Sequence, residues 1–312
     1  MSDDRSARPR ILVIKLGALG DFVQAMGPAA AIRRHHAAAH ITLLTSPAYA
    51  ALARRAPYFD EVWLDERAGW SRPLGFLRLA LKLRAARFAR VYDLQTSDRS
   101  SAYSYFLGPK APEWSGIARG ASHPHANPAR DAMHTLERQV EQLRMAGIDD
   151  VKPPDLSWAA TDLARFALPA RFLLLAPGGS RHRPEKRWAA GRFGQIADRA
   201  QRRGILPVVI GGPDETGLGR EIRRSCPAAR DLIGQTSFGD IVALGGRALH
   251  ALGNDTGPMH LIVAGGGPAT VLYSAASDPL LTAPRGARVT ILRRPDLGDL
   301  AVEEVAATLP LG

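Results

Sequence analysis

The chain has 312 residues, of which 46% are hydrophobic and 23% are charged. Because this length exceeds that of one typical compact domain and the apolar content suffices for sizeable cores, we expect two globular domains and exclude wholesale disorder. The net charge of +11 indicates nucleic acid, an anionic membrane surface or a phosphorylated substrate as a partner, unless the arginines only form solvated faces.

The first half of the chain alternates short apolar runs with helical segments, as in a parallel sheet covered by helices. Strands are predicted at residues 11–14, 41–44, 62–64 and 91–94. Helices are predicted at residues 21–34, 48–55, 74–88 and 132–145. The helix over 74–88 has Leu74, Leu77, Leu81 and Phe88 as its apolar face. Residues 109–130, rich in Gly, Pro, His and Ser, are predicted to form a loop.

The same alternation restarts after a proline-containing linker at residues 149–155. Strands are predicted at residues 172–175, 207–210, 249–252 and 269–273. Helices are predicted at residues 189–204, 218–225, 238–244 and 259–264. We therefore predict an α/β fold of two Rossmann-like parallel-sheet domains, residues 1–155 and 156–312. They should face a central cleft, because open α/β sheets bind ligands beyond the carboxyl ends of their strands.

A glycine-containing turn follows the first strand, with the sequence Leu16-Gly17-Ala18-Leu19-Gly20-Asp21. Glycines at a strand end let the backbone approach a ligand closely. The spacing is not G-x-G-x-x-G, and the carboxylate of Asp21 disfavours a phosphate there. Taken alone, Asp21 is also consistent with a helix cap.

Three strand ends of the second half carry small polar turns. Residues 177–180 (PGGS) precede Lys186, and backbone amides with a lysine are typical of a phosphate site. Residues 211–215 end in Glu215, which suits ribose hydroxyls. Residues 253–260 (GNDTGPMH) open a helix whose first amides suit a diphosphate. Each turn alone is also consistent with an ordinary strand-to-helix connection.

Several site classes are disfavoured by what the sequence lacks. The single Cys226 excludes an internal disulfide and a multi-cysteine zinc site, and we interpret it as structural. His36 and His40 lack the glutamate of H-E-x-x-H, so we interpret them as a solvated helix end and expect no metal. No G-x-S-x-G elbow occurs, which disfavours an α/β-hydrolase. We find no signal peptide or membrane helix, and expect a soluble, cytoplasmic protein.

Taken together, these motifs resemble glycosyltransferase family 9, the heptosyltransferases of the lipopolysaccharide inner core. The resemblance covers about residues 11–284. Its motifs are ILVIKLGALGD (11–21) with Pro28 downstream, DLQTSDRS (93–100), APGGS…KRW (176–188), VVIGGPDE (208–215) and GNDTGPMHLIVA (253–264). The departures are the Gly-Gly-Ser phosphate loop, the glycines at 265–267 and the loop 109–130, which matches no family motif.

The resemblance implies a GT-B fold in which the first domain binds the acceptor and the second binds the nucleotide sugar. It implies an inverting, metal-independent transfer of heptose from ADP-heptose to a lipid-linked acceptor, with no cofactor. Asp21 would be the general base, and Lys186 would stabilise the departing diphosphate. Asp93 and Arg99 would face the acceptor. The implied donor contacts are Gly178, Gly179, Ser180, Lys186, Glu215, Asp255, Thr256, Gly257 and His260.

Within this donor set, the resemblance implies that Glu215 holds the ribose and that Asp255 holds the sugar hydroxyls. His260 would support the phosphates. The basic surplus would then attract a phosphorylated glycolipid and anionic lipid at the inner face of the inner membrane, rather than nucleic acid. Three alternatives stay open: a GT-B transferase with another nucleotide sugar or a polysaccharide acceptor, a non-catalytic nucleotide-sugar-binding protein, and an NAD-dependent oxidoreductase, which the absent G-x-G-x-x-G disfavours.

Overall fold

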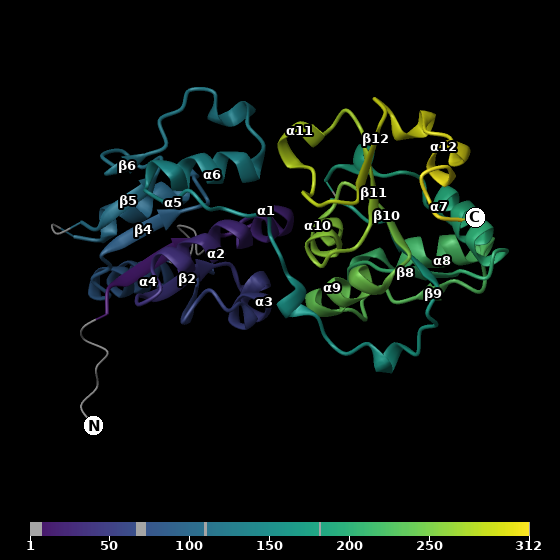
Figure 1. Cartoon of the computed structure of the whole chain (residues 1–312), viewed down its shortest axis with the longest axis horizontal. Coiled ribbons are helices and arrows are strands. Elements are labelled where there is room, and N and C mark those ends of the chain that lie inside the picture. The colour runs from purple at the N-terminus through teal and green to yellow at the C-terminus, as the bar shows by residue number, and fades with distance from the viewer. Residues whose placement is uncertain (1–7, 67–72, 109–110, 181, 312) are drawn as a thin grey trace. The chain divides into compact units, whose positions relative to one another are not determined.

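The computed structural model describes residues 8–66, 73–108, 111–180 and 182–311 (Figure 1). The chain divides into two compact units, residues 1–154 and 155–312. This division lies one residue before the boundary expected from the sequence. Each unit contains one six-stranded sheet in which all neighbouring strands pair in parallel.

The sheet of the first unit has the strand order β3-β2-β1-β4-β5-β6. Its strands are β1 (Arg10–Ile14), β2 (His40–Thr45), β3 (Glu61–Leu64), β4 (Arg90–Asp93), β5 (Glu113–Gly116) and β6 (His123–Pro124). β1 lies between β2 and β4, and its four apolar residues are all buried, as expected for a central parallel strand. The order reverses at β1, so the carboxyl end of this strand is a switch point where open sheets bind ligands.

The helices of the first unit are α1 (Leu19–Gln24), α2 (Met26–His35), α3 (Ala50–Arg55), α4 (Pro73–Ala85), α5 (Asp98–Ala102) and α6 (Thr135–Met145). The predicted single helix over 21–34 is wrong in detail, because it begins at Leu19 and is interrupted at Ala25. The predicted loop 109–130 is also wrong in part, since β5 and β6 lie within it. Trp114 of β5 is buried and lies opposite Val91 of β4. Packing against the core therefore stabilises a strand in a segment whose composition is typical of a loop.

The face of helix α4 that packs against the core is opposite to the face that was predicted to do so. Leu83 is fully buried in a cluster with Leu12 and Ile14 of β1. Three of the four residues predicted for the core face are instead exposed: Leu74 is 69%, Leu77 53% and Leu81 58% accessible. The fourth, Phe88, lies beyond the end of the helix and is buried in the core. The helix therefore has two apolar faces, and hydrophobic periodicity alone cannot tell which one is buried.

The sheet of the second unit has the order β12-β11-β10-β7-β8-β9. Its strands are β7 (Phe172–Ala176), β8 (Leu206–Val209), β9 (Arg230–Asp231), β10 (His250–Asn254), β11 (Ala269–Tyr273) and β12 (Val289–Arg293). Its helices are α7 (Ala190–Gln201), α8 (Thr216–Ser225), α9 (Phe238–Arg247), α10 (Gly257–Ala264), α11 (Pro279–Thr282) and α12 (Val302–Ala306). The sequence did not predict β9, which is only two charged residues long, or β12, none of whose residues is buried.

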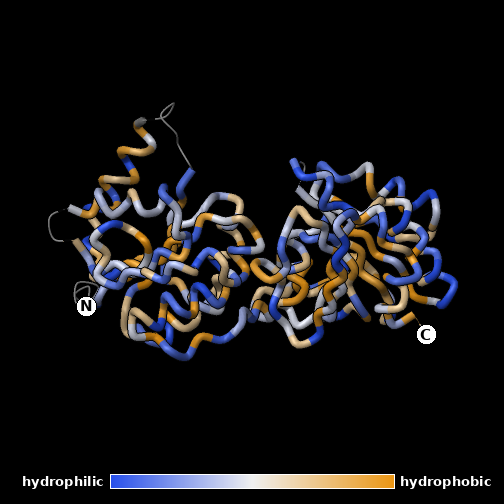
Figure 2. Tube along the Cα trace, turned by 90° about the horizontal axis from the view of Figure 1, so that it is seen from above, coloured by the Kyte–Doolittle hydropathy of each residue, from blue (hydrophilic) through white to orange (hydrophobic). Residues whose placement is uncertain are grey.

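A continuous apolar core holds the second unit together. Orange, hydrophobic strands run through the interior of each unit in Figure 2. In the second unit, Trp188 is buried against Phe193, and its indole nitrogen donates to the carbonyl of Leu300 at 3.0 Å. Because a buried indole N–H needs an acceptor, this bond fixes the segment before α7 against the end of the chain. Cys226 is buried in the same core, as expected for a structural thiol.

Candidate functional site

The turn at the carboxyl end of β1 requires glycine. Gly17 has a φ of +123°, and a Cβ atom at this position would lie 2.7 Å from the ring of Tyr49. Tyr49 in turn stacks on Phe22 of α1, with ring centroids 4.9 Å apart. The turn therefore packs tightly against its neighbours and delivers the chain into α1 at a defined angle.

Asp21 stands in the first turn of α1 rather than at its cap. The N-cap residue is Ala18, so the helix-capping alternative is not what the structure contains. The carboxylate is half-buried, and its Oδ1 accepts a long hydrogen bond from Thr135 Oγ1 at 3.5 Å. Asp21 thus joins the switch point of the sheet to the start of α6.

Two cations that sequence reasoning did not single out interact electrostatically with Asp21. Lys15 is 3% accessible, and its Nζ donates to the carbonyl of Leu94 at 3.1 Å. Burial lowers the pKa of Lys15, and the charge of Asp21 acts against that shift. Burial also lowers the pKa of Arg138, where Asp21 again opposes the change. The signal in the sequence was a lysine directly after a wholly apolar strand, which is an unusual place for a charge.

The expectation that Asp93 faces the acceptor is contradicted by its burial. Its side chain is fully inaccessible, and Oδ1 accepts from the amides of Gln95 (3.1 Å) and Thr96 (2.9 Å). Burial raises the pKa of Asp93 to about 6, against the effect of its hydrogen bonds from Thr96 and Ser100. Asp93 therefore shapes the turn between β4 and α5 and is not available to a ligand.

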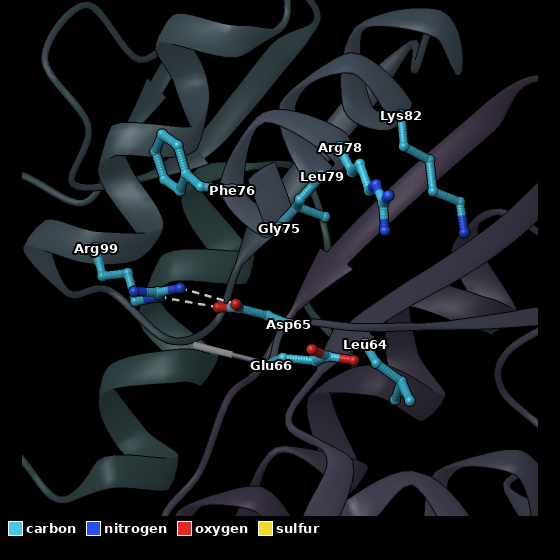
Figure 3. A pocket seen from close by; sticks show the side chains of 9 residues that line it. All are labelled: Leu64, Asp65, Glu66, Gly75, Phe76, Arg78, Leu79, Lys82 and Arg99. Atoms are coloured by element: carbon cyan, nitrogen blue, oxygen red, sulfur yellow. Dashed lines mark hydrogen bonds and ion pairs between the residues drawn. The ribbon is translucent and has the colours of Figure 1, made fainter. Parts of the chain in front are cut away.

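Arg99 lines a cavity, but its charge is already paired. Its Nε and Nη2 donate to the two carboxylate oxygens of Asp65 at 2.9 and 2.8 Å, and Nε also bonds Tyr103 at 2.9 Å. The hydrogen bond to Asp65 raises the pKa of Arg99. Figure 3 shows this pair at a cavity of about 230 Å³. The cavity is lined by Leu64, Asp65, Glu66, Gly75, Phe76, Arg78, Leu79, Lys82 and Arg99.

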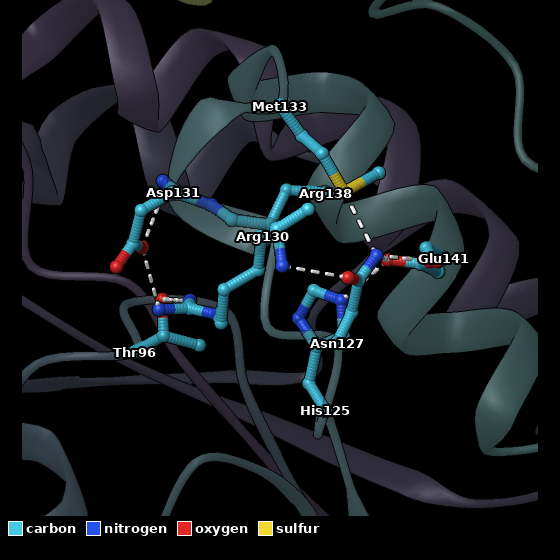
Figure 4. A network of polar contacts seen from close by, with 9 residues as sticks. Thr96, His125, Asn127, Arg130, Asp131, Met133, Arg138 and Glu141 are labelled. Atoms are coloured by element: carbon cyan, nitrogen blue, oxygen red, sulfur yellow. Dashed lines mark hydrogen bonds and ion pairs between the residues drawn. The ribbon is translucent and has the colours of Figure 1, made fainter.

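The end of the predicted loop 109–130 is anchored to α6 by a polar network (Figure 4). Glu141 accepts from Asn127 Nδ2 at 3.0 and 2.8 Å and bonds His125 Nε2 at 2.8 Å. Arg130 Nη2 donates to Thr96 Oγ1 at 3.0 Å. These contacts hold Arg130 beside the turn that Asp93 shapes, so the network organises the same edge of the sheet as Asp21 and Lys15.

In the second unit, Glu215 reaches across to the glycine turn after β7. Its Oε1 accepts from the amide of Gly179 at 3.0 Å, and its Oε2 accepts from the amide of Gly212 at 2.8 Å. A Cβ atom on Gly178 would lie 2.1 Å from this carboxylate, so a larger residue there would displace Glu215 from its amide bonds. While Glu215 stays there, the amide of Gly179 is not available to a diphosphate. Ser180 is exposed at the end of this turn.

Lys186 and Asp255 form an ion pair at the carboxyl edge of the same sheet. Nζ and Oδ2 are 2.7 Å apart, and the side chains are 13% and 10% accessible. The backbone amide of Asp255 donates to Leu272, which places its side chain beside Tyr273. Burial, followed by the charge of Asp255, raises the pKa of the Tyr273 phenol. Sequence reasoning named both charged residues but did not predict that they pair with each other.

Asn254, which sequence reasoning also missed, ties the loops of this edge together. It is fully buried, and its Nδ2 donates to the carbonyls of Pro177 (2.8 Å) and Gly178 (3.2 Å). Its Oδ1 accepts from the amide of Trp188 at 3.0 Å. One side chain therefore sets the β7 turn, the segment after Lys186 and the start of α10 relative to one another.

Helix α10 presents its N-terminus at this edge. Thr256 is its N-cap and makes no side-chain capping bond, and Gly257 follows as the first helical residue. Both are partly exposed. His260, which was expected to support the phosphates, is buried at the end of the first turn of the helix. Helix N-termini with accessible amides attract anions, so Thr256 and Gly257 suit a phosphate group.

The remaining candidate groups can be placed as well. His36 is half-buried against the Tyr92 hydroxyl at 2.7 Å, and burial lowers its pKa to about 4, whereas His40 bonds Glu61 at 3.4 Å. Helix α2 ends at His35, as expected, and β2 begins at His40, but the two histidines are only partly exposed and have separate partners. Among the described residues, no group of three or more His, Cys, Asp or Glu is placed to hold a metal. No helix within the described ranges is long and apolar enough to cross a membrane.

Known proteins share both the sequence pattern and the architecture of this chain. Lipopolysaccharide core heptosyltransferase OpsX of Haemophilus influenzae is 23% identical over 295 residues, which cover 88% of this chain and 81% of OpsX. The solved structure of a family 9 glycosyltransferase from Veillonella parvula has a TM-score of 0.80 at 23% identity, covering 92% of this chain and 86% of that one. That of E. coli ADP-heptose lipopolysaccharide heptosyltransferase II has a TM-score of 0.78 at 22% identity, covering 96% and 97%.

These likenesses confirm the predicted GT-B class with two Rossmann-like parallel sheets. The sequence profile of glycosyltransferase family 9 (heptosyltransferase) matches residues 76–306, which is well over half of the chain. The motifs at the strand ends of both units, the topology and this match agree, and the chain belongs to glycosyltransferase family 9 (heptosyltransferase).

Proposed function

We propose that this protein is an inverting, metal-independent heptosyltransferase that moves heptose from ADP-heptose to a lipopolysaccharide inner-core acceptor. The observation that carries the proposal is the Lys186–Asp255 pair beside the N-terminus of α10. It combines a cation for a leaving diphosphate with a carboxylate for sugar hydroxyls. The names of the related heptosyltransferases support the choice of substrates.

In the proposed reaction, the first unit binds the acceptor and Asp21 is the general base. The acceptor hydroxyl oxygen attacks the anomeric carbon of heptose, and its proton passes to the Asp21 carboxylate. The bond from that carbon to the phosphate oxygen breaks, and ADP leaves with the electron pair. A single displacement of this kind inverts the anomeric configuration. Thr135 would orient the carboxylate through its hydrogen bond.

In the second unit, the proposed donor site consists of Lys186, Asp255 and the N-terminus of α10. The diphosphate would compete with Asp255 for Lys186 and bind the amides at Thr256 and Gly257. Asp255, once released from Lys186, would accept hydrogen bonds from the heptose hydroxyls. Since Lys186 and the helix N-terminus neutralise the developing negative charge, we propose that no divalent metal is needed.

The other donor contacts follow from the same geometry. Glu215 retains unused acceptor positions after its two amide bonds, so it is suited to the ribose hydroxyls. Gly178 and Ser180 would approach the diphosphate from the β7 turn, together with Gly179 if Glu215 shifts. Buried His260 would support the first turn of α10 rather than touch the phosphates. Because the acceptor is lipid-linked, we place the reaction at the cytoplasmic face of the inner membrane.

The test combines nucleotide binding with turnover. ADP and ADP-heptose should raise the thermal unfolding midpoint more than UDP or GDP nucleotides do. With ADP-heptose and a heptose-free inner-core glycolipid, the protein should release ADP in the presence of EDTA. NMR of the glycolipid product should show that the configuration at the anomeric carbon of heptose is inverted. Asp21→Asn should slow release about 10²–10⁴-fold, whereas Asp149→Asn, at an exposed carboxylate of the same unit, should not slow it. Preferential response to a UDP or GDP sugar would overturn the donor assignment.

A further inference from the structure

Helix α4 exposes an apolar row that no part of the described structure covers. Leu74, Leu77 and Leu81 follow the i, i+3, i+7 spacing of one helix face and are all more than half accessible. The opposite face, with Leu83, supplies the contact with the core. Figure 2 shows the helix as an orange-rich coil that stands out from the first unit. An exposed apolar surface of this kind marks an interaction site.

The exposed large apolar side chains of the described residues concentrate at this place. Five of the eight belong to residues 64–81: Leu64, Leu74, Phe76, Leu77 and Leu81. Phe76 is partly held by an edge-to-face contact with Phe106, at a centroid distance of 4.9 Å. The helix that carries the leucine row is therefore packed against the first unit through its other face, and the row itself is exposed to solvent.

The charges of α4 are all positive. Arg78, Lys82 and Arg84 are exposed, and the helix contains no Asp or Glu. At 3.6 residues per turn, Arg84 flanks the leucine row on one side and Arg78 and Lys82 flank it on the other. Lys82 also rests on the Trp63 ring, with Nζ 3.9 Å from the centroid. An apolar row bordered by cations on both sides matches an anionic bilayer, whose phosphates lie just above its hydrocarbon.

We propose that α4 is a membrane-docking helix that lies in the surface plane of an anionic bilayer. The leucine row enters the boundary of the hydrocarbon, and the three cations contact lipid phosphates. The helix has 13 residues, too few to span a bilayer, so it lies on the surface.

This inference rests on the proposed function only in that the acceptor is lipid-linked. The cavity beside Arg99 is partly lined by Gly75, Phe76, Arg78, Leu79 and Lys82 of α4 (Figure 3). Docking would place that cavity at the membrane surface, where the head group of such an acceptor is found. The same helix would thus bring the first unit to its substrate.

Flotation of the full chain with vesicles tests the proposal without turnover. The vesicles contain phosphatidylcholine alone or with phosphatidylglycerol, and no glycolipid acceptor. Wild-type protein should float with the anionic vesicles at low salt and should be largely released at high salt. Each basic residue near such a surface changes binding about fivefold, so Arg78→Glu/Arg84→Glu should weaken it at least tenfold. Leu77→Ser/Leu81→Ser should weaken it about tenfold.

Control variants change exposed residues of the second unit: Leu280→Ser, and Arg203→Glu/Arg224→Glu. They should bind vesicles within about twofold of wild type, and every variant should keep its stabilisation by ADP. Equal binding to neutral and anionic vesicles, or unchanged binding of both α4 variants, would overturn the docking role. A further outcome would also overturn it: α4 variants that dissociate a dimer in sedimentation but have no other effect. The leucine row would then join two copies of the chain. Loss of ADP stabilisation in wild type would instead contradict the proposed function.

Discussion

The Lys186–Asp255 pair allows stability and catalysis to be separated. At 2.7 Å and an effective dielectric constant of 20, the attraction between the two charges is about 6 kcal/mol before desolvation is counted. Desolvation of two largely buried groups cancels most of this attraction. Lys186→Gln leaves the partly accessible Asp255 without its partner and should lower the free energy of unfolding by roughly 1–3 kcal/mol. The double variant Lys186→Gln/Asp255→Asn should regain most of this loss, because no charge is left uncompensated.

Activity should behave differently, since the diphosphate still lacks its cation. We expect kcat of Lys186→Gln to fall about 10²–10³-fold, and no recovery in the double variant. Urea unfolding monitored by tryptophan fluorescence and ADP release from ADP-heptose measure the two effects. Lys152→Gln, at an exposed lysine of the first unit, is the control and should change neither. If the double variant regains activity together with stability, Lys186 serves only to hold Asp255, and the leaving-group role is refuted.

Three further predictions concern other parts of the site. Asp21→Asn should lower kcat about 10²–10⁴-fold with unchanged ADP binding, and weakened ADP binding would argue against its placement as the acceptor-side base. Burial raises the pKa of Asp93 to about 6, above its ordinary 3.8, so the stability from its protonated form is complete below pH 4 and is lost as pH rises through 6. The difference in unfolding free energy between wild type and Asp93→Asn should therefore change by about 3 kcal/mol from pH 3 to pH 7, and a constant difference would contradict this. Gly178→Ala places a Cβ atom 2.1 Å from the Glu215 carboxylate, which would have to move and lose its hydrogen bonds from the amides of Gly179 and Gly212. This change should cost about 1–3 kcal/mol of stability and weaken ADP binding. Gly217→Ala, which meets no atom within 4 Å, should not weaken ADP binding.

The sequence by itself determined the architecture of the protein. Wholly apolar runs such as Ile11–Ile14 must be buried on both faces, so they predict central parallel strands. Glycines at the ends of those strands mark where a backbone or side chain approaches closely, as Gly17 and Gly178 do. Both requirements involve only a few neighbouring residues, so they can be recognised from the sequence alone. For the same reason the strand-end motifs were sufficient to identify the family.

Only the tertiary structure decided which side chains meet. Lys186 and Asp255 are 69 residues apart in sequence, and their pairing depends on how β7, β10 and α10 are stacked. Asp93 is buried because the turn after β4 folds over its side chain. Lys15 lies near Asp21 because its ammonium group donates to the carbonyl of Leu94, directly after β4. The exposed row of α4 was mistaken for its buried face because both faces are apolar. Periodicity reports that a face is apolar, but burial depends on which neighbour the fold supplies.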